Sequence, residues 1–448
     1  MNDSVTLTRL PKPNPGHTIE QMGEDLQRRL RRLGVVKGPR QLKPARQPPA
    51  AQEAETRPID ALLPGIRRVQ TDVGSCYVLD TVFPVTHQHG LQRLADFHVA
   101  PLATAAAIAD HPQLADLTAD EFLFLDTETT GLAGAGTLAF MVGVAFFEED
   151  AFVVRQYFLR DHGDETAMLH LLAELLIQRP GLVTFNGRSF DLPLLESRFI
   201  LNRLDGLVGD LRASPHLDLL PPARRLWRAR LGSCALGTLE TNLLALQRTH
   251  EDVPGWAIPG LYRDYLLSGD AAELLRVFYH NRVDMLSMVT LAVRVLEQFA
   301  HPSPDHHPLD LHSLARWQIG LGRWEEAEAT LQLAVAQAGA DERPMVLSEL
   351  GGLLKRQDRR DEALPLWREL AENDNRDVSA HVELAMYYEW HQPNLEVAAA
   401  WTRRALTIVD GWSRPRAALI RPELAHRLER LERKLAADGA PGAGRSEG

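Results

Sequence analysis

The sequence lacks most of the features that would mark a secreted, membrane or nucleic-acid-coating protein. Its 448 residues include only two cysteines, Cys76 and Cys234, so neither a disulfide framework nor a cysteine zinc site is expected. No apolar run approaches the ~18 residues of a membrane span, and the N-terminus lacks the apolar stretch of a signal peptide. Positive charge is also scarce: the formal net charge of −11 argues against non-specific coating of nucleic acid. These absences predict a cytoplasmic protein without a membrane partner.

The most informative stretch present is a short apolar run that ends on two carboxylates. Residues 122–125 have the composition of a buried strand, and Asp126 and Glu128 follow, two positions apart. Alternate residues of a strand point to one face, so both carboxylates are expected to converge. Burying two like charges together is costly unless a cation lies between them, and oxygen ligands suit Mg²⁺ or Mn²⁺. A strand end before a polar turn would give the same local pattern.

Two further acidic residues lie downstream in contexts that such a site would need. Asp191 follows an apolar strand at 182–185 and a turn, where a helix with apolar spacing begins. An aspartate at that position can also be a helix cap. His280 and Asp284 are four residues apart in a long amphipathic pattern, so they share one helix face. A solvated His/Asp pair would have this spacing too, but apolar neighbours crowd the face.

The spacing of apolar residues predicts an α/β domain around these motifs. Residues 121–128, 138–147 and 152–159 are typical of a three-stranded antiparallel meander. A helix over 164–177 and a fourth strand at 182–185 are expected next. A right-handed crossover would return this fourth strand to the side of the first, and its following loop to the first pair of carboxylates.

With the motifs in this order, the sequence resembles the ribonuclease-H-like DEDD 3′→5′ exonucleases, and within them the YprB-like family, which often carries a helical-repeat tail. The resemblance covers about residues 70–300. It implies an α/β ribonuclease-H-like fold, a mixed sheet flanked by helices. It also implies a site for two divalent ions, Mg²⁺ or Mn²⁺, in which Asp126 and Glu128 match the first motif, Asp191 the second and Asp284 the third.

The residues before Asp284 depart from the family pattern. In one branch a histidine precedes the last aspartate by five residues, and in the other a tyrosine precedes it by four. Here Tyr279 stands at five and His280 at four. A spacing of four returns to nearly the same helix face, whereas a spacing of five points away from it. We therefore expect His280, rather than Tyr279, to face the metals and to orient or deprotonate the attacking water.

A helical stretch at 223–230 places Trp227 among four arginines. Arginine can hold phosphates and tryptophan can stack on a base, so this stretch is a candidate nucleic-acid contact. The same composition is also typical of an ordinary exposed helix.

The C-terminal part of the chain repeats a helical pattern. A small or β-branched residue is followed four positions later by a large one at Ala327, Ala363 and Val397, which are 36 and 34 residues apart. These spacings are close to the tetratricopeptide period, and stacked helix pairs are typical of that class. An all-α tetratricopeptide-like repeat domain that binds a protein partner is therefore expected.

Composition and motifs together divide the chain into five parts. The expected parts are a mostly disordered region with a short basic helix (1–60), a small β-containing extension (61–118), the ribonuclease-H-like exonuclease domain (119–300), the tetratricopeptide-like repeats (309–436) and a disordered tail (437–448).

The sequence thus predicts a divalent-metal-dependent 3′→5′ exonuclease that hydrolyses phosphodiester bonds of single-stranded or 3′-end nucleic acid with two metal ions. The alternative is a non-catalytic adaptor whose repeats bind a protein while the nuclease-like domain is a scaffold. A scaffold has no need of a costly cluster of carboxylates, which favours the enzyme. The sequence leaves open the choice of DNA or RNA, exo- or endonucleolytic cleavage, the repeat partner and the oligomeric state.

Overall fold

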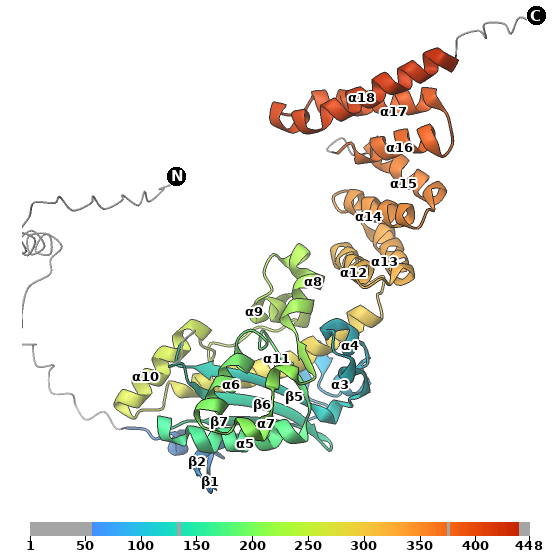
Figure 1. The fold of residues 1–448 in the computed structure, drawn as a ribbon. Helices are drawn as coiled ribbons and strands as arrows, with labels where there is room; N and C mark the ends of the chain where they lie inside the picture. Colours follow the sequence, from blue (N-terminus) through green and yellow to red (C-terminus); the bar gives the residue numbers. More distant parts are fainter. Residues whose placement is uncertain (1–55, 132–135, 374–376, 439–448) are drawn as a thin grey trace, which may run out of the picture. The chain divides into compact units, whose positions relative to one another are not determined.

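A seven-stranded mixed sheet forms the centre of the first half of the protein (Figure 1). The computed structural model describes residues 56–131, 136–373 and 377–438. In spatial order the strands are β1 (Arg67–Thr71), β2 (Gly74–Pro84), β7 (Ala151–Phe158), β6 (Ala139–Glu148), β5 (Phe122–Thr129), β8 (Gly181–Thr184) and β9 (His216–Asp218). A separate two-stranded ribbon joins β3 (Gln88–His89) to β4 (Gln92–Arg93).

The pairing of these strands confirms the expected ribonuclease-H-like order. Strands β5, β6 and β7 form the antiparallel meander, and β8 lies parallel to β5, with Phe124 paired to Val183. Strand β9 continues the parallel part beside β8. The strands of the N-terminal extension join the same sheet, because β2 pairs along its length with β7. The carboxyl ends of β5, β8 and β9 therefore lie at one edge of the sheet.

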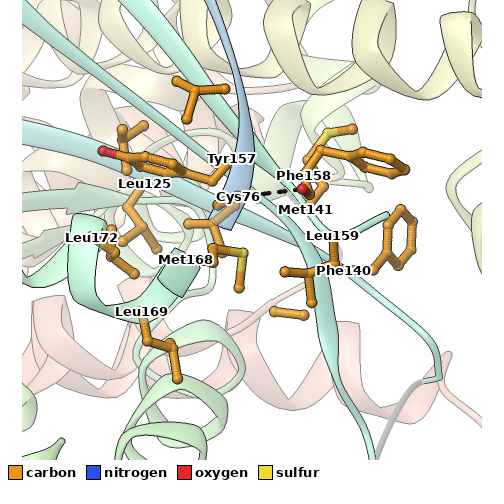
Figure 2. Close-up of a cluster of buried hydrophobic side chains, with 14 of the residues drawn as sticks. Cys76, Leu125, Phe140, Met141, Tyr157, Phe158, Leu159, Met168, Leu169 and Leu172 are labelled. Atoms are coloured by element: carbon orange, nitrogen blue, oxygen red, sulfur yellow. Dashed lines mark hydrogen bonds between the residues drawn. The ribbon is translucent and has the colours of Figure 1, made fainter. Parts of the chain in front are cut away.

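Alternate residues of β5 fill two separate hydrophobic cores. Leu123 and Leu125 belong to the core that includes Met168 and Leu172 of helix α5 (Glu165–Gln178). Figure 2 shows part of this core around Cys76, a buried free cysteine whose thiol points to the Phe158 carbonyl.

The other face of β5 carries Phe122 and Phe124, which belong to the second core. Met285 and Val289 of helix α11 (Leu274–Ala300) contribute to the same core. Strand β5 is thus buried on both faces, and α11 also contacts β6 and β7. The packing of α11 on β5 therefore fixes the position of the end of β5 relative to the N-terminal half of α11.

Short helices complete the first half of the fold. They are α2 (Ile59–Leu62), α3 (Asp96–Val99), α4 (Thr104–Ala109), α6 (Asp191–Leu201), α7 (Asp205–Val208), α8 (Leu220–Leu231), α9 (Leu236–Leu239) and α10 (Ile258–Ser268). A π-helical turn, Glu240–Leu244, follows α9 and is the least regular part of this region.

The second half is all-helical, and its helices pack as successive pairs. They are α12 (Pro308–Gly320), α13 (Trp324–Gln337), α14 (Arg343–Arg356), α15 (Arg360–Asn373), α16 (Ser379–Trp390), α17 (Leu395–Asp410) and α18 (Arg414–Asp438). Helix α12 pairs with α13, α14 with α15, and α16 with α17. Ala327 and Ala363, two of the recurring small residues, are fully buried in the second helix of their pairs. Paired helices agree with the expected all-α class, and their assignment as tetratricopeptide repeats stays a prediction.

Helix α12 takes part in two hydrophobic cores. Leu314 and Trp317 belong to the core that contains α11, whereas Leu311 and Ala315 belong to the core of the following helices. The expected boundary between the two domains, in the gap 301–308, stays a prediction. Helix α12 begins at the end of this gap and packs both against α11 before it and against the helices after it.

Several expectations concern parts of the chain that lie outside the described residues. The N-terminal region (1–60), expected to be mostly disordered with a short basic helix, lies outside the described residues apart from 56–60. The C-terminal tail lies outside them from residue 439 onwards. Within the described ranges, no helix combines the length and apolar character needed to cross a membrane.

Candidate functional site

The sequence-predicted residues lie on three elements that meet at the carboxyl end of β5. Asp126 and Glu128 are in the last half of that strand, Asp191 is the first residue of α6, and His280 and Asp284 lie on α11, which crosses β5. Their electrostatic influence on one another shows that the fold brings them together. The charges of Asp191, Glu128 and Asp284 all act on Asp126.

Asp126 is held by a buried network of amides. Nδ2 of Asn281 on α11 donates to Asp126 Oδ2 at 3.0 Å. The Asn281 oxygen accepts from Nε2 of Gln156 on β7 at 3.0 Å, and the same nitrogen donates to the Phe278 carbonyl at 2.9 Å. Gln156 and Asn281 are fully buried, so these bonds fix which way the Asn281 amide points.

The network requires a glycine on the neighbouring strand. Gly143 of β6 is paired with Asp126, and a Cβ at that position would lie 2.1 Å from Asn281 Oδ1. Any larger residue would therefore displace Asn281 from Asp126. Neither Asn281 nor Gly143 stands out in the sequence, since their roles depend on a pairing and a helix crossing that no local pattern encodes.

Asp191 reaches the site from the other face of the sheet. Its carboxylate accepts a hydrogen bond of 2.5 Å from Oγ1 of Thr127, the residue between Asp126 and Glu128. Asp191 is 3% exposed, and α6 begins without a side-chain cap. The N-cap of α6 is Phe190, and the Asp191 carboxylate is engaged by Thr127 and by its own backbone N–H.

The burial of these acids makes their charges costly. Burial, followed by the charges of Asp191, Glu128 and Asp284, raises the pKa of Asp126 well above its ordinary value. Burial raises the pKa of Glu128 to about 7, against the attraction of His280, and that of Asp191 to about 6, against the hydrogen bond from Thr127. A positive charge at this edge of the sheet would relieve the cost.

His280 lies beside Asp284, as its four-residue spacing requires. Its Nε2 is 3.5 Å from Asp284 Oδ2, and its Nδ1 is 2.7 Å from Asp252 Oδ1. Burial opposes the imidazolium, but the charges of Asp284 and Glu128 and the bond to Asp252 outweigh it and raise the pKa of His280. The Tyr279 hydroxyl instead accepts a hydrogen bond of 3.1 Å from Thr249.

A second group lies near the same Nδ1 atom. Nη1 of Arg248 is 3.1 Å from His280 Nδ1. One ring nitrogen cannot both donate to a carboxylate and accept from a guanidinium. An ionised carboxylate can only accept, so the 2.7 Å contact with Asp252 assigns the Nδ1 proton to the hydrogen bond with Asp252.

Arg248 is a further residue of this site that sequence analysis missed. Its Nη2 donates to Asp284, and Nη2 and Nε each hold the buried carboxylate of Glu240 at 2.7 Å. Glu240 also accepts from Ser287 at 2.6 Å, and Ser287 in turn lies 2.9 Å from Nε2 of His89. A chain of buried polar groups thus runs from the N-terminal ribbon to Asp284. The only sequence signal was an arginine within an otherwise patternless stretch.

The donor set fits a hard divalent cation in its chemistry. Asp126, Glu128 and Asp191 form no ion pair with a lysine or arginine within the described residues, and of the three only Glu128 is stabilised by nearby cations, His280 and Arg248. Across the same ranges, no three Asp, Glu, His or Cys side chains stand in an arrangement that could hold a metal as they are. The fourth carboxylate, Asp284, is occupied by Arg248.

The mixed sheet, the crossing helix and the acidic edge define a domain of the ribonuclease H superfamily. The superfamily profile matches residues 123–296, a stretch that includes all four acidic residues, His280 and Arg248. The chain is also 32% identical over 321 residues to the uncharacterized protein YprB of Bacillus subtilis (strain 168), which covers 70% of this chain and 76% of YprB. This chain therefore belongs to the YprB family.

Proposed function

We propose that this protein is a divalent-metal-dependent nuclease, acting as a 3′→5′ exonuclease on a single-stranded or frayed 3′ end. The observation that carries the proposal is the meeting of buried carboxylates from β5, α6 and α11 at one edge of a ribonuclease-H-like sheet. Such a cluster has a stability cost, and its chemistry is that of a magnesium or manganese site.

In this proposal Asp126, Glu128, Asp191 and Asp284 hold the cations. Two bound Mg²⁺ or Mn²⁺ ions would supply an activated water and stabilise the leaving oxygen of a phosphodiester. Asn281 keeps one oxygen of Asp126 engaged at 3.0 Å and so orients the other toward the site. Asp284 becomes available as a ligand once Arg248 leaves it.

His280 would act on the proton of the attacking water. Asp252 holds its Nδ1 at 2.7 Å, which leaves Nε2 on the side of Asp284. A base held in this way by a carboxylate has a fixed ring orientation, and general base catalysis typically contributes 10²–10⁴ in rate. His280→Ala should therefore lower turnover by about that factor while changing Mn²⁺ affinity little, and Tyr279→Phe serves as the neighbouring control.

The direct test is degradation of a 5′-labelled single strand with and without Mn²⁺, for wild type and for Asp126→Asn. Wild type should shorten the strand from its 3′ end, and the variant should lose both activity and Mn²⁺ binding by calorimetry while remaining folded. Asp120→Asn, an exposed carboxylate just before β5, is the matched control. Unchanged Mn²⁺ binding in Asp126→Asn would refute the assignment of the site.

An adaptor role remains the second candidate, because the helical half contains a hollow of its own. This hollow has a volume of about 820 Å³ and is lined by residues of α12, α14 and α16, among them Arg316, Ser348 and Ser379. Wild-type protein that never cleaves DNA or RNA with Mn²⁺, yet binds a partner through this half, would favour the adaptor.

A further inference from the structure

The arginines of α8 differ in what their side chains contact. Arg230 forms an ion pair with Asp310 of α12 at 2.8 Å, and Arg225 lies over the Trp317 ring at 4.9 Å. Trp227 is fully buried and donates from Nε1 to Gln298 at 2.9 Å. The interpretation of Trp227 as a base-stacking residue is therefore wrong, since these three side chains fasten α8 to its neighbours.

Arg224 and Arg228 are exposed and lie on one side of α8. They are one helical turn apart, and within the described residues neither forms an ion pair or a hydrogen bond to an acid. They differ in this from Arg230 of the same helix, which is paired with Asp310. Two unpaired guanidinium groups on one face form a local positive charge in a chain whose net charge is −11.

Both side chains line a hollow of about 510 Å³, which we call the arginine hollow. Its other polar lining residues include Asn186 and Ser233, and Phe185 contributes an apolar wall. Guanidinium, amide and hydroxyl groups together are the usual donors to phosphate oxygens. The chemistry of the hollow therefore suits an anion with several oxygen atoms.

The hollow is attached to the candidate metal site by a short loop. Asp218 at the end of β9 accepts backbone N–H bonds from Asn186 at 2.7 Å, Arg188 at 3.1 Å and Leu220 at 3.1 Å. One carboxylate thus ties the loop after β8 to the start of α8. The same loop continues into Asp191, so the hollow and the acidic edge lie at two ends of one clamped connection.

We propose that the arginine hollow binds the phosphodiester backbone of the single strand whose end lies at the carboxylates. The proposal rests on the nuclease function above. An acidic site repels a polyanion, so the strand needs positive charge close by that does not belong to the metal ligands. Arg224 and Arg228 supply it, without base contacts, so the hollow holds strands of any sequence.

The test compares two double variants of equal charge in the full-length protein. Arg224→Gln/Arg228→Gln removes the hollow's charge, and Arg403→Gln/Arg421→Gln removes two exposed arginines of the helical half. Binding of a fluorescein-labelled single strand is measured by anisotropy in EDTA over a salt series. We expect the first variant alone to lose about tenfold or more in affinity, and its salt slope to fall by about 1.4, the value for two phosphate contacts on a single strand.

The outcomes separate this proposal from the nuclease proposal, because binding in EDTA needs no hydrolysis. Weakened binding by the hollow variant in a protein that never cleaves would support the hollow and reject the nuclease. Mn²⁺-dependent cleavage with equal binding by both variants would reject the hollow alone. Wild type without affinity for the strand at low salt, or complete displacement of the strand by millimolar inorganic phosphate or by poly-glutamate, would also overturn it.

Discussion

The guanidinium of Arg248 contacts the carboxylate of Asp284, so the chain's own cation neutralises one of the four acids proposed to hold metal. The same guanidinium satisfies Glu240, whose side chain is 1% exposed. Arg248 therefore has two roles that oppose each other when a metal binds. It must stay with Glu240, which has no access to water, and it must release Asp284.

Arg248→Gln should weaken the protein and strengthen its binding of metal. Glu240 would lose its cation, which costs about 3–5 kcal/mol for a buried pair. Asp284 would lose a competing partner, so Mn²⁺ affinity should rise roughly tenfold, equivalent to about 1.4 kcal/mol. Thermal unfolding with and without Mn²⁺ and calorimetric titration measure both effects. The exposed Arg263→Gln is the control, and equal Mn²⁺ affinity in all three proteins would contradict the competition.

Gly143→Ala should disturb the site from a residue that never touches substrate. The added Cβ would lie 2.1 Å from Asn281 Oδ1, so Asn281 must move away from Asp126 and Gln156. Overpacking of this kind typically costs about 1–3 kcal/mol. The free energy of unfolding measured in urea and the nuclease rate should both fall. Gly260→Ala in α10, where no atom lies within 4 Å of the added methyl, should leave both unchanged.

Glu389→Gln should loosen the last helices. The Glu389 carboxylate on α16 is inaccessible to water and accepts from Arg430 at 2.8 Å and Lys434 at 2.9 Å, both on α18. Because these cations are themselves partly exposed, the loss should be about 1.5–3 kcal/mol, the range for hydrogen bonds to charged groups.

Hydrogen exchange of α18 is the measurement for that change. Arg403→Gln breaks an exposed pair with Glu432 in the same region and should change stability by less than about 1 kcal/mol. If both substitutions accelerate exchange equally, burial of Glu389 is not what holds α18.

The contribution of His216 to the free energy of unfolding should be lost as the pH drops from about 6.5 to about 4. Burial lowers the pKa of His216 to about 4 in the folded protein, where its Nε2 lies 2.8 Å from Thr184 Oγ1. As the pH falls, His216 of the unfolded chain is protonated first, near its ordinary pKa of about 6.5. Its contribution to stability is therefore complete above pH 6.5 and is lost progressively as the pH falls toward 4. The loss amounts to about 3 kcal/mol. On going from pH 7 to pH 4, the unfolding free energy of His216→Gln should therefore change in favour of the folded state relative to wild type by about this amount, whereas the surface substitution His301→Gln should follow wild type.

The parts of the fold that sequence analysis predicted well are those with strong local patterns. The apolar run before Asp126 forms the first half of β5, and the meander and the following helix agree with their expected ranges within a few residues. The spacing of His280 and Asp284 predicted a shared face because a helix repeats regularly.

What sequence analysis missed depends on contacts between distant residues. The pairing of β2 with β7 joins residues far apart in the chain, and alternation within β2 does not say which strand it will meet. Arg248 and Glu240 lie around a π-helical turn without periodic pattern, so neither could be placed beside Asp284 beforehand. The base-stacking interpretation of Trp227 failed because an amphipathic pattern indicates a buried face without identifying which residues lie on it.

Helix α11 is continuous for 27 residues, so a single element extends from the acidic edge of the sheet to the helical half. Asp284 lies near its first third, and Phe299, about 22 Å further along the axis, packs edge-to-face against Trp317 of α12 with ring centroids 4.8 Å apart. The contact with the helical half and a proposed metal ligand thus belong to one uninterrupted element, so the packing of α12 is one of the constraints on where α11, and with it Asp284, can lie.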